Sequence, residues 1–217
     1  MMAKPVSRFS LTRLILASLT LALWALSPNP GLNAQMQDPE IGEVAPAFTL
    51  PDTYDNSHSL SDHSGQWVVL EWLNYGCPFV QKHYGSGNMQ RLQADFGRKG
   101  VAWLSIVSSA PGKQGFYEPD EMNAVNEEQG NNALAVLLDP SGTVGLAYGA
   151  KTTPQMYVIS PEGVLLYNGA IDDMPTTRLS DIEGAKNYLA LALEEAMSGR
   201  TVTKPTTQPY GCSVKYN

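Results

Sequence analysis

The segment WVVLEWLNYGCPFVQKHY, residues 67–84, decides the fold. Its first part, residues 67–73, is an apolar run with a single acid, which is typical of a strand buried in the centre of a sheet. Cys77 and Pro78 follow after a short turn, and proline is favoured in the first turn of a helix. The segment therefore predicts a strand, a turn that ends in a cysteine, and a helix.

The sequence after this segment predicts an alternation of helices and strands. Gly85 and Gly87 are expected to break or kink the helix that begins at Cys77, and Pro161-Glu162-Gly163 is expected to turn a hairpin. Further buried strands are expected at 101–107, 133–139, 156–160 and 164–169. Further helices are expected at 119–129 and 144–148.

The last part of the chain predicts one more helix and an extended tail. A capping box at Ser180 and Glu183 marks the expected start of the helix, and Gly199 its end. Its expected buried stripe is Ile182, Ala185, Leu189, Leu193 and Ala196. Residues 201–217 are rich in Thr and Pro and should be extended. The order of elements predicts a parallel βαβ half followed by antiparallel strands, which is an α/β three-layer sandwich with a mixed central sheet.

Length and composition suit one sizeable domain and exclude several classes of protein. The chain has 217 residues, 43% of them hydrophobic, and its 14 basic and 21 acidic residues give a net charge of −7, which speaks against nucleic acid as a partner. Two cysteines cannot build a disulfide-dense scaffold or a four-cysteine zinc site. His58, His63 and His83 lack zinc-finger spacing and are expected on the surface. The glycines form no phosphate-binding loop, so no cofactor is expected.

Residues 1–34 have the pattern of a secretory signal peptide. Lys4, Arg8 and Arg13 precede an apolar run at 14–26, which is short for a helix that spans a bilayer. Cleavage after Ala34 would leave a domain at 35–217 with an extended tail from about residue 200. This product is expected to be periplasmic or secreted, without stable membrane contact, where its cysteines can form a disulfide. An uncleaved membrane anchor is the alternative.

Cys77 is the strongest candidate for a catalytic residue. It lies between a buried strand and a helix N-terminus, where backbone N–H groups and the helix dipole favour negative charge. A thiol in this place is expected to have a lowered pKa and to be a better nucleophile at neutral pH. The alternative is a small buried hydrophobic residue, a common role of cysteine, but the placement favours a functional one.

Motifs along most of the mature chain resemble the thioredoxin-like superfamily. The opening Gly42-x-x-Ala45-Pro46-x-Phe48-x-Leu50, followed by Ser59-Leu60-Ser61-Asp62 and Gly65, is similar to redoxins of the alkyl hydroperoxide reductase/thiol-specific antioxidant (AhpC/TSA) type. The resemblance is closer to a peroxiredoxin-like subfamily and covers about residues 41–217. Its motifs are Asn74-x-x-Cys77-Pro78-Phe79-Val80-x-Lys82, Tyr148-Gly149-Ala150, Thr153-Pro154, Ile171-Asp172-Asp173 and Gly211-Cys212-Ser213-Val214-Lys215.

The chain departs from its relatives next to Cys77. Cys77 matches the first cysteine of the thioredoxin Cys-x-x-Cys motif, and Val80 takes the second position, so a local dithiol cannot form. The peroxidatic cysteine of peroxiredoxins also aligns with Val80. Their Pro-x-x-x-Thr-x-x-Cys signature is absent, because its Thr and Pro positions, counted from Cys77, hold Asn74 and Leu70. The resemblance therefore does not imply orthodox peroxidase activity.

Glu71 is a second catalytic candidate, six residues before Cys77 in the predicted strand. This spacing matches the buried aspartate under the thioredoxin active site. Burial would raise the pKa of the carboxyl group and let it carry a proton to or from a sulfur. The alternative is an acid that faces water from an edge strand, and the strand pattern leaves both possibilities open.

The resemblance implies a substrate site around Pro78, Thr153 and Pro154. Pro154 is similar to the cis-proline of thioredoxin-like folds, whose loop packs against the active cysteine. The resemblance also implies that the backbone of Thr153 can pair with a bound chain. A cis bond at Pro154 is a prediction, because most bonds before proline are trans, and an ordinary turn proline is the alternative.

Cys212 lies far from Cys77 in the sequence, in the extended tail. A tail can fold back over an active site, and Cys212 would then attack a sulfenic acid or a mixed disulfide on Cys77. The alternative is a permanent structural disulfide that pins the tail, which would stabilise the fold by about 4–5 kcal/mol in the chain-entropy treatment. The sequence does not separate these two roles.

Cys77 and the resemblance together predict an exported thiol-dependent oxidoreductase that acts on protein disulfides or peroxides. In this hypothesis Cys77 is the nucleophile, Glu71 moves protons and Cys212 resolves. The alternative hypothesis is that the protein is a non-catalytic binding module on the thioredoxin fold, closed by a structural Cys77–Cys212 disulfide. A metal-delivery protein is the third possibility, but Gln81 stands where copper chaperones of the superfamily carry their second cysteine, so no metal site is expected.

Overall fold

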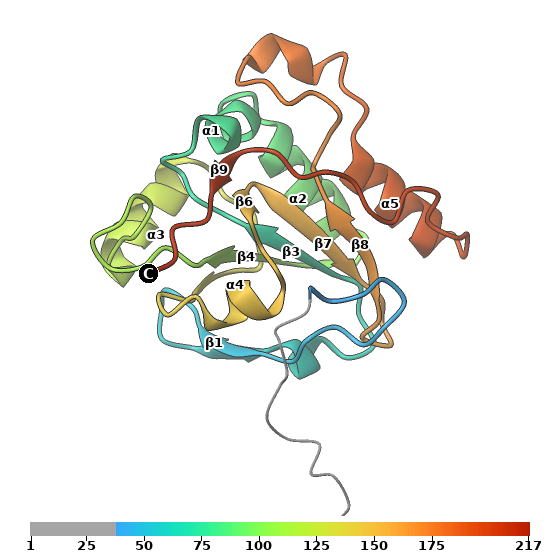
Figure 1. The fold of residues 1–217 in the computed structure, drawn as a ribbon, viewed down its shortest axis with the longest axis horizontal. Coiled ribbons are helices and arrows are strands. Elements are labelled where there is room, and N and C mark those ends of the chain that lie inside the picture. Colours follow the sequence, from blue (N-terminus) through green and yellow to red (C-terminus); the bar gives the residue numbers. More distant parts are fainter. Residues whose placement is uncertain (1–37) are drawn as a thin grey trace, which may run out of the picture. The chain divides into compact units, whose positions relative to one another are not determined.

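The computed structural model describes residues 38–217 (Figure 1). The predicted signal peptide, residues 1–34, lies outside the described residues. Within residues 38–217, no helix has the length and apolar character that crossing a membrane requires.

The strand before Cys77 lies at the centre of a five-stranded sheet with the order β5-β4-β3-β7-β8. All five strands were predicted, and they are β3 (Val68–Trp72), β4 (Ala102–Val107), β5 (Ala135–Leu138), β7 (Gln155–Ile159) and β8 (Leu165–Gly169). β3, β4 and β5 pair in parallel, whereas β7 pairs antiparallel with both β3 and β8. Because β3 has a neighbour on each side and helices above and below, all of its side chains are buried.

Helices cover both faces of this sheet. They are α1 (Pro78–Gly85), α2 (Asn88–Gly97), α3 (Pro119–Glu128), α4 (Thr143–Ala147) and α5 (Tyr188–Met197). α1, α2, α3 and α5 bury side chains on the face of Val69 and Leu73, and α4 packs on the face of Leu70 and Trp72. The predicted break between α1 and α2 falls at Gly87, whose φ of 71° is a left-handed conformation that glycine adopts readily. This arrangement is a thioredoxin-like three-layer α/β sandwich, which confirms the predicted fold class.

Short strands lie outside the five-stranded sheet, and the sequence did not reveal them. They are β1 (Thr49–Pro51), β2 (Ser57–Ser59), β6 (Thr152–Thr153) and β9 (Cys212–Ser213). β1 pairs antiparallel with β2, and β6 pairs antiparallel with β9. Two or three residues are too few for a period-two pattern to be recognised. The pairing of β6 with β9 brings the C-terminal tail onto the segment before β7.

The last helix begins later than the capping box predicts. Residues Leu179–Ile182 form only a short 3₁₀ helix, and α5 begins after Asn187. The side-chain oxygen of Asn187 accepts the backbone N–H of Ala190 at 2.8 Å, which is the contact expected of a strong N-cap residue. Of the predicted stripe, Ile182 and Ala185 therefore lie outside the helix.

Two histidines that were expected on the surface are buried instead. His63 is 8% exposed, and His83 is fully buried in α1. The ring of His83 lies 2.9 Å from the side-chain amide of Asn88 and 3.2 Å from the hydroxyl of Tyr210. The prediction failed because the partner that covers His83, the C-terminal tail, is distant in the sequence.

The tail is extended, as predicted, and is hydrogen-bonded along most of its length. The backbone N–H of Asn168 in β8 donates to the carbonyl of Pro205 at 3.0 Å, and farther along Val214 donates to the carbonyl of Lys151 at 3.0 Å. In Figure 1 the tail, in dark red, runs from α5 past β6 to the C-terminus. It therefore passes over the end of the sheet at which Cys77 lies.

Candidate active site

Cys77 is the N-cap residue of α1 and is fully buried. Asn74 fixes the turn that presents it, because its carbonyl accepts the backbone N–H of Cys77 at 3.0 Å and its side-chain oxygen accepts that of Gly76 at 2.8 Å. Gly76 leaves room for Gln114, since an added Cβ would lie 2.9 Å from that side chain. The turn after β3 therefore places a thiol at a helix N-terminus.

Thr153 lies against the Cys77 thiol, and Pro154 follows it directly in the chain. The peptide bond between them is cis, which confirms the prediction from the sequence. The thiol of Cys77 donates a hydrogen bond to the carbonyl oxygen of Thr153, with an Sγ–O distance of 3.0 Å. Pro78 is the first residue of α1 and follows Cys77 directly. The fold thus gathers the three predicted substrate-binding residues around Cys77, and their role in binding stays a prediction.

Cys212 lies beside Cys77 although 135 positions separate them in the sequence. In the antiparallel pair of β6 and β9, Cys212 is the register partner of Thr153. The backbone nitrogen of Cys212 lies 3.4 Å from the sulfur of Cys77, and both cysteines are free thiols. The fold therefore brings the two predicted reactive cysteines together.

Gly211 permits this close approach of the tail. Its φ of 141° lies in the range that side-chain-bearing residues rarely adopt. An added Cβ would overlap the carbonyl oxygen of Thr153 and lie 2.7 Å from its carbonyl carbon. A residue other than glycine at this position would therefore push Cys212 away from Cys77.

The two thiols differ in acidity. Burial opposes ionisation of Cys77, but the neighbouring Cys212 side chain and the backbone N–H groups of Val80 and Cys212 outweigh it, so that the pKa of Cys77 is lowered. Burial and the neighbouring Cys77 raise the pKa of Cys212 to about 11. Of the pair, Cys77 is therefore suited to be the attacking thiolate and Cys212 its protonated partner.

Glu71 is fully buried in β3, so the alternative of an acid that faces water is wrong. Burial raises the pKa of its carboxyl group, although hydrogen bonds to the ionised form act in the opposite direction. The donors are Trp103 at 2.9 Å, Tyr84 and Ser105 at 3.0 Å, and Gln93 at 3.1 Å. These partners come from α1, α2 and β4, and none of them is Cys77. A role for Glu71 in proton transfer stays a prediction.

Sequence reasoning missed a buried polar cluster next to the two cysteines. Lys82 of α1 and Asp172 form an ion pair with an N–O distance of 3.2 Å, and neither side chain is more than 2% exposed. Tyr210, two residues before Cys212, is hydrogen-bonded to both. Lys82 and Asp172 belong to motifs that carry the family resemblance, which marked these positions without assigning a role to them.

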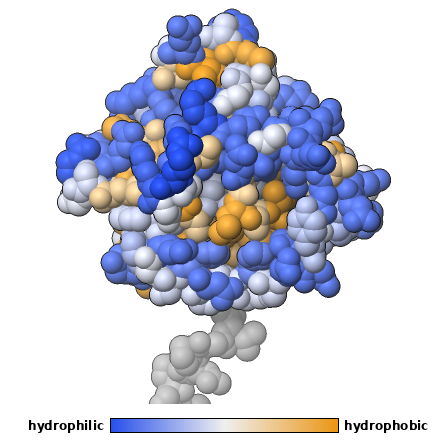
Figure 2. Space-filling view, turned by 180° about the vertical axis from the view of Figure 1, so that it is seen from behind, coloured by the Kyte–Doolittle hydropathy of each residue, from blue (hydrophilic) through white to orange (hydrophobic). Residues whose placement is uncertain are grey.

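Two cavities, both next to α3 and β5, are large enough for a ligand. One of about 610 Å³ lies between α3 and β5, and a smaller apolar one of about 220 Å³ is lined by Val107, Phe116 and Leu138 among others; neither is lined by a cysteine. On the face behind that of Figure 1, an apolar area is surrounded by hydrophilic residues (Figure 2). Among residues 38–217, His, Cys, Asp and Glu side chains form no group of three that could hold a metal ion.

Known proteins are similar to this chain in sequence and in fold. Residues 41–168 match the sequence model of the AhpC/TSA family. A Mycobacterium tuberculosis protein named "Putative peroxiredoxin" is 30% identical over 132 residues, which are 61% of this chain and 78% of that protein. An uncharacterized conserved protein from Geobacillus kaustophilus has a TM-score of 0.69 at 28% identity, covering 82% of this chain and 93% of that one. A hypothetical protein from Sinorhizobium meliloti 1021 has a TM-score of 0.70 at 23% identity, and the match covers 83% of this chain and 97% of that one. The chain belongs to the AhpC/TSA family of thioredoxin-like redoxins.

Proposed function

We propose that the protein is an exported thiol-dependent oxidoreductase whose redox-active pair is Cys77 and Cys212. The observation that carries the proposal is the distance of 3.4 Å between the sulfur of Cys77 and the backbone nitrogen of Cys212. The chain has Val80 where a thioredoxin has its second cysteine. In this proposal Cys212 supplies the missing second thiol from the tail, where it pairs with Thr153.

The pair can act on a disulfide in two exchange steps. The thiolate of Cys77 attacks one substrate sulfur, the substrate S–S bond breaks, and the other sulfur leaves as a thiolate that takes up a proton. Cys212 then loses its proton and attacks the sulfur of Cys77, which forms the Cys77–Cys212 disulfide and releases the second substrate thiol. The substrate is reduced by two electrons, and the protein dithiol is oxidised by two.

A peroxide is the other substrate class that this pair can reduce. Attack of the Cys77 thiolate on a peroxide oxygen breaks the O–O bond, and Cys77 becomes a sulfenic acid while an alcohol or water leaves. Cys212 attacks the sulfenic sulfur and releases water, which again leaves the Cys77–Cys212 disulfide. An external dithiol returns the pair to the reduced state. In both reactions Glu71 is proposed to carry protons, and Pro78, Thr153 and Pro154 to contact the substrate.

A non-catalytic binding module with a structural disulfide is the second candidate. It is supported by the complete burial of Cys77 and by the hydrogen bonds that hold the tail on both sides of Cys212. A disulfide in such a protein would form once, during folding, and would resist reduction in the native state.

Reactions of the native cysteines in the mature chain, residues 35–217, separate the two candidates. We expect hydrogen peroxide or oxidised glutathione to convert the reduced protein into the Cys77–Cys212 disulfide, measured as loss of two thiols and by mass. In the Cys212→Ser variant the reaction should stop at a sulfenic acid or a glutathione adduct on Cys77. The Cys77→Ser variant should form neither product on residue 77. A Cys77 that reacts with neither oxidant, or a disulfide that dithiothreitol reduces only after unfolding, contradicts the redox function.

Export is proposed from the pattern of residues 1–34. Expression of the full chain in a Gram-negative host should give a periplasmic product that begins at Gln35, as read by N-terminal sequencing. The chain without residues 1–34 is the control and should stay in the cytoplasm. A full-length product in the membrane fraction would support the membrane anchor instead.

A further inference from the structure

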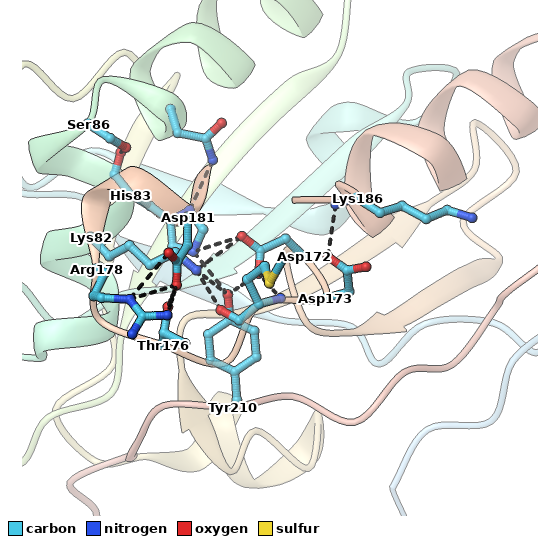
Figure 3. A network of polar contacts seen from close by, with 12 residues as sticks. Lys82, His83, Ser86, Asp172, Asp173, Thr176, Arg178, Asp181, Lys186 and Tyr210 are labelled. Carbon is cyan, nitrogen blue, oxygen red and sulfur yellow. Dashed lines mark hydrogen bonds and ion pairs between the residues drawn. The ribbon is translucent and has the colours of Figure 1, made fainter. Parts of the chain in front are cut away.

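The buried polar cluster lies between α1 and the C-terminal tail (Figure 3). The ammonium group of Lys82 lies 3.2 Å from the carboxylate of Asp172 and donates to the carbonyl of Met174 at 2.6 Å. The hydroxyl of Tyr210 donates to the other oxygen of Asp172 and accepts from Lys82 at 3.3 Å. Buried ion pairs add little net stability because of their desolvation cost, so a gain in stability does not account for this one.

His83 completes the set of groups around Tyr210. Burial lowers the pKa of His83 to about 4, so its ring is neutral at pH 7 and adds no second positive charge beside Lys82. One ring nitrogen accepts the amide of Asn88 at 2.9 Å, which leaves the other to donate to the hydroxyl of Tyr210 at 3.2 Å. A tyrosine hydroxyl can donate once and accept twice, so Asp172, Lys82 and His83 satisfy it completely.

Tyr210 fixes the tail at the point where the tail reaches Cys77. Its ring also packs edge-on against Phe79 of α1, with ring centroids 5.7 Å apart. Phe79, Lys82 and His83 belong to the helix whose N-cap is Cys77. The group that holds the tail and the thiol under the tail are therefore parts of one helix, and only Gly211 separates Tyr210 from Cys212.

We propose that Lys82, His83 and Asp172 form a receptor for Tyr210, and that Tyr210 is a positioning residue that holds Cys212 against Cys77. The inference deepens the proposed function and rests on it for the disulfide step. Tyr210 touches neither sulfur in this role. It sets how often the tail is closed, and thereby the effective concentration of the Cys212 thiol at Cys77.

A mixed disulfide with glutathione makes the contribution of Tyr210 measurable. Cys77 has no exposed surface, so a glutathione bonded to its sulfur must displace the tail. When the thiolate of Cys212 attacks the sulfur of Cys77, the Cys77–Cys212 bond forms, the bond to glutathione breaks, and glutathione leaves as a thiolate that takes up a proton. The contacts of Tyr210 are present in the closed disulfide and absent in the open adduct, so the ratio of these two species reports their strength.

The variant Tyr210→Phe removes the hydroxyl and keeps the ring. In a buffer of reduced and oxidised glutathione, quenched with acid and read by mass spectrometry, the ratio of closed disulfide to glutathione adduct should fall about tenfold, as expected for a lost hydrogen bond to a charged group. Tyr148→Phe is the matched control. It also loses a buried hydroxyl, which donates to the carbonyl of Pro46 at 2.7 Å on the α4 face of the sheet, and it should leave the ratio unchanged.

A second measurement needs no disulfide. In the Cys212→Ser background, iodoacetamide can alkylate Cys77 only when the tail opens, so Tyr210→Phe should speed this reaction about tenfold and Tyr148→Phe should not. If neither the ratio nor the rate responds to Tyr210→Phe, the positioning role is wrong. If the wild type forms no closed disulfide at all, the proposed function fails instead, and the alkylation rates still decide the role of Tyr210.

Discussion

Two opposing effects act on a thiol that is buried at the start of a helix. Removal from water disfavours the thiolate of Cys77, whereas the neighbouring Cys212 side chain and the backbone N–H groups around it favour the charge and prevail. The same neighbourhood raises the pKa of Cys212 to about 11. Two residues of one type thus differ in acidity, because one is an N-cap and the other lies in a strand that faces it.

At the same scale, Gly211 decides whether the tail can dock. Gly211→Ala should break the pairing of β9 with β6, because its Cβ would overlap the carbonyl of Thr153. The positive φ adds strain, so we expect a loss of about 1–3 kcal/mol in the free energy of unfolding and faster hydrogen exchange at the amide of Val214. Gly184→Ala is the control, since nothing lies within 4 Å of a Cβ there. Unchanged protection of the Val214 amide in Gly211→Ala would refute this account.

At the scale of elements, the sequence predicts a strand or a helix correctly where the pattern that marks it lies within a few adjacent residues. The apolar run of β3 and the Cys77-Pro78 start of α1 each follow from a few adjacent residues. The start of α5 was predicted wrongly, because Asn187 provides a cap that competes with the one at Ser180. The polar side of α1 could not be predicted to be buried, since the groups that cover Lys82 and His83 are contributed by residues about 90 to 130 positions away.

The burial of His83 in α1 has a consequence for the pH dependence of stability. Its folded pKa of about 4 lies below the ordinary value of 6.5, because burial disfavours the charged ring. Between these two values the unfolded chain binds more protons, so stability falls as the pH is lowered from 6.5 to 4, by about 3 kcal/mol at most. His83→Gln should remove this part of the slope in urea unfolding measured at pH 7 and pH 4.5. Equal slopes for the variant and the wild type would count against a buried neutral His83.

At the scale of the whole molecule, the sheet order and the tail path differ in how well the sequence predicts them. The parallel and antiparallel halves follow from the alternation of strands and helices and from the hairpin turn, and the family resemblance marked Cys77, Thr153, Pro154 and Cys212. The path of the tail depends on contacts with β8, β6 and α1 that no local pattern encodes. The juxtaposition of Cys77 and Cys212, on which the proposed chemistry depends, therefore needed the structure.

A disulfide between Cys77 and Cys212 would close a loop that contains most of the sheet. For a loop of this length, the chain-entropy treatment gives a stabilisation of about 4–5 kcal/mol, or a rise of roughly 10–20 °C in Tm for a domain of this size. A redox-active pair should fall short of that rise, because the low-pKa thiol of Cys77 stabilises the reduced native state and makes the disulfide easier to reduce. We therefore expect calorimetry of the oxidised and reduced mature chain to give a Tm difference below 10 °C. A Cys77→Ser, Cys212→Ser double variant should give no difference with and without reductant. A rise of 20 °C in the wild type would identify the bridge as structural and remove Cys77 from the chemistry.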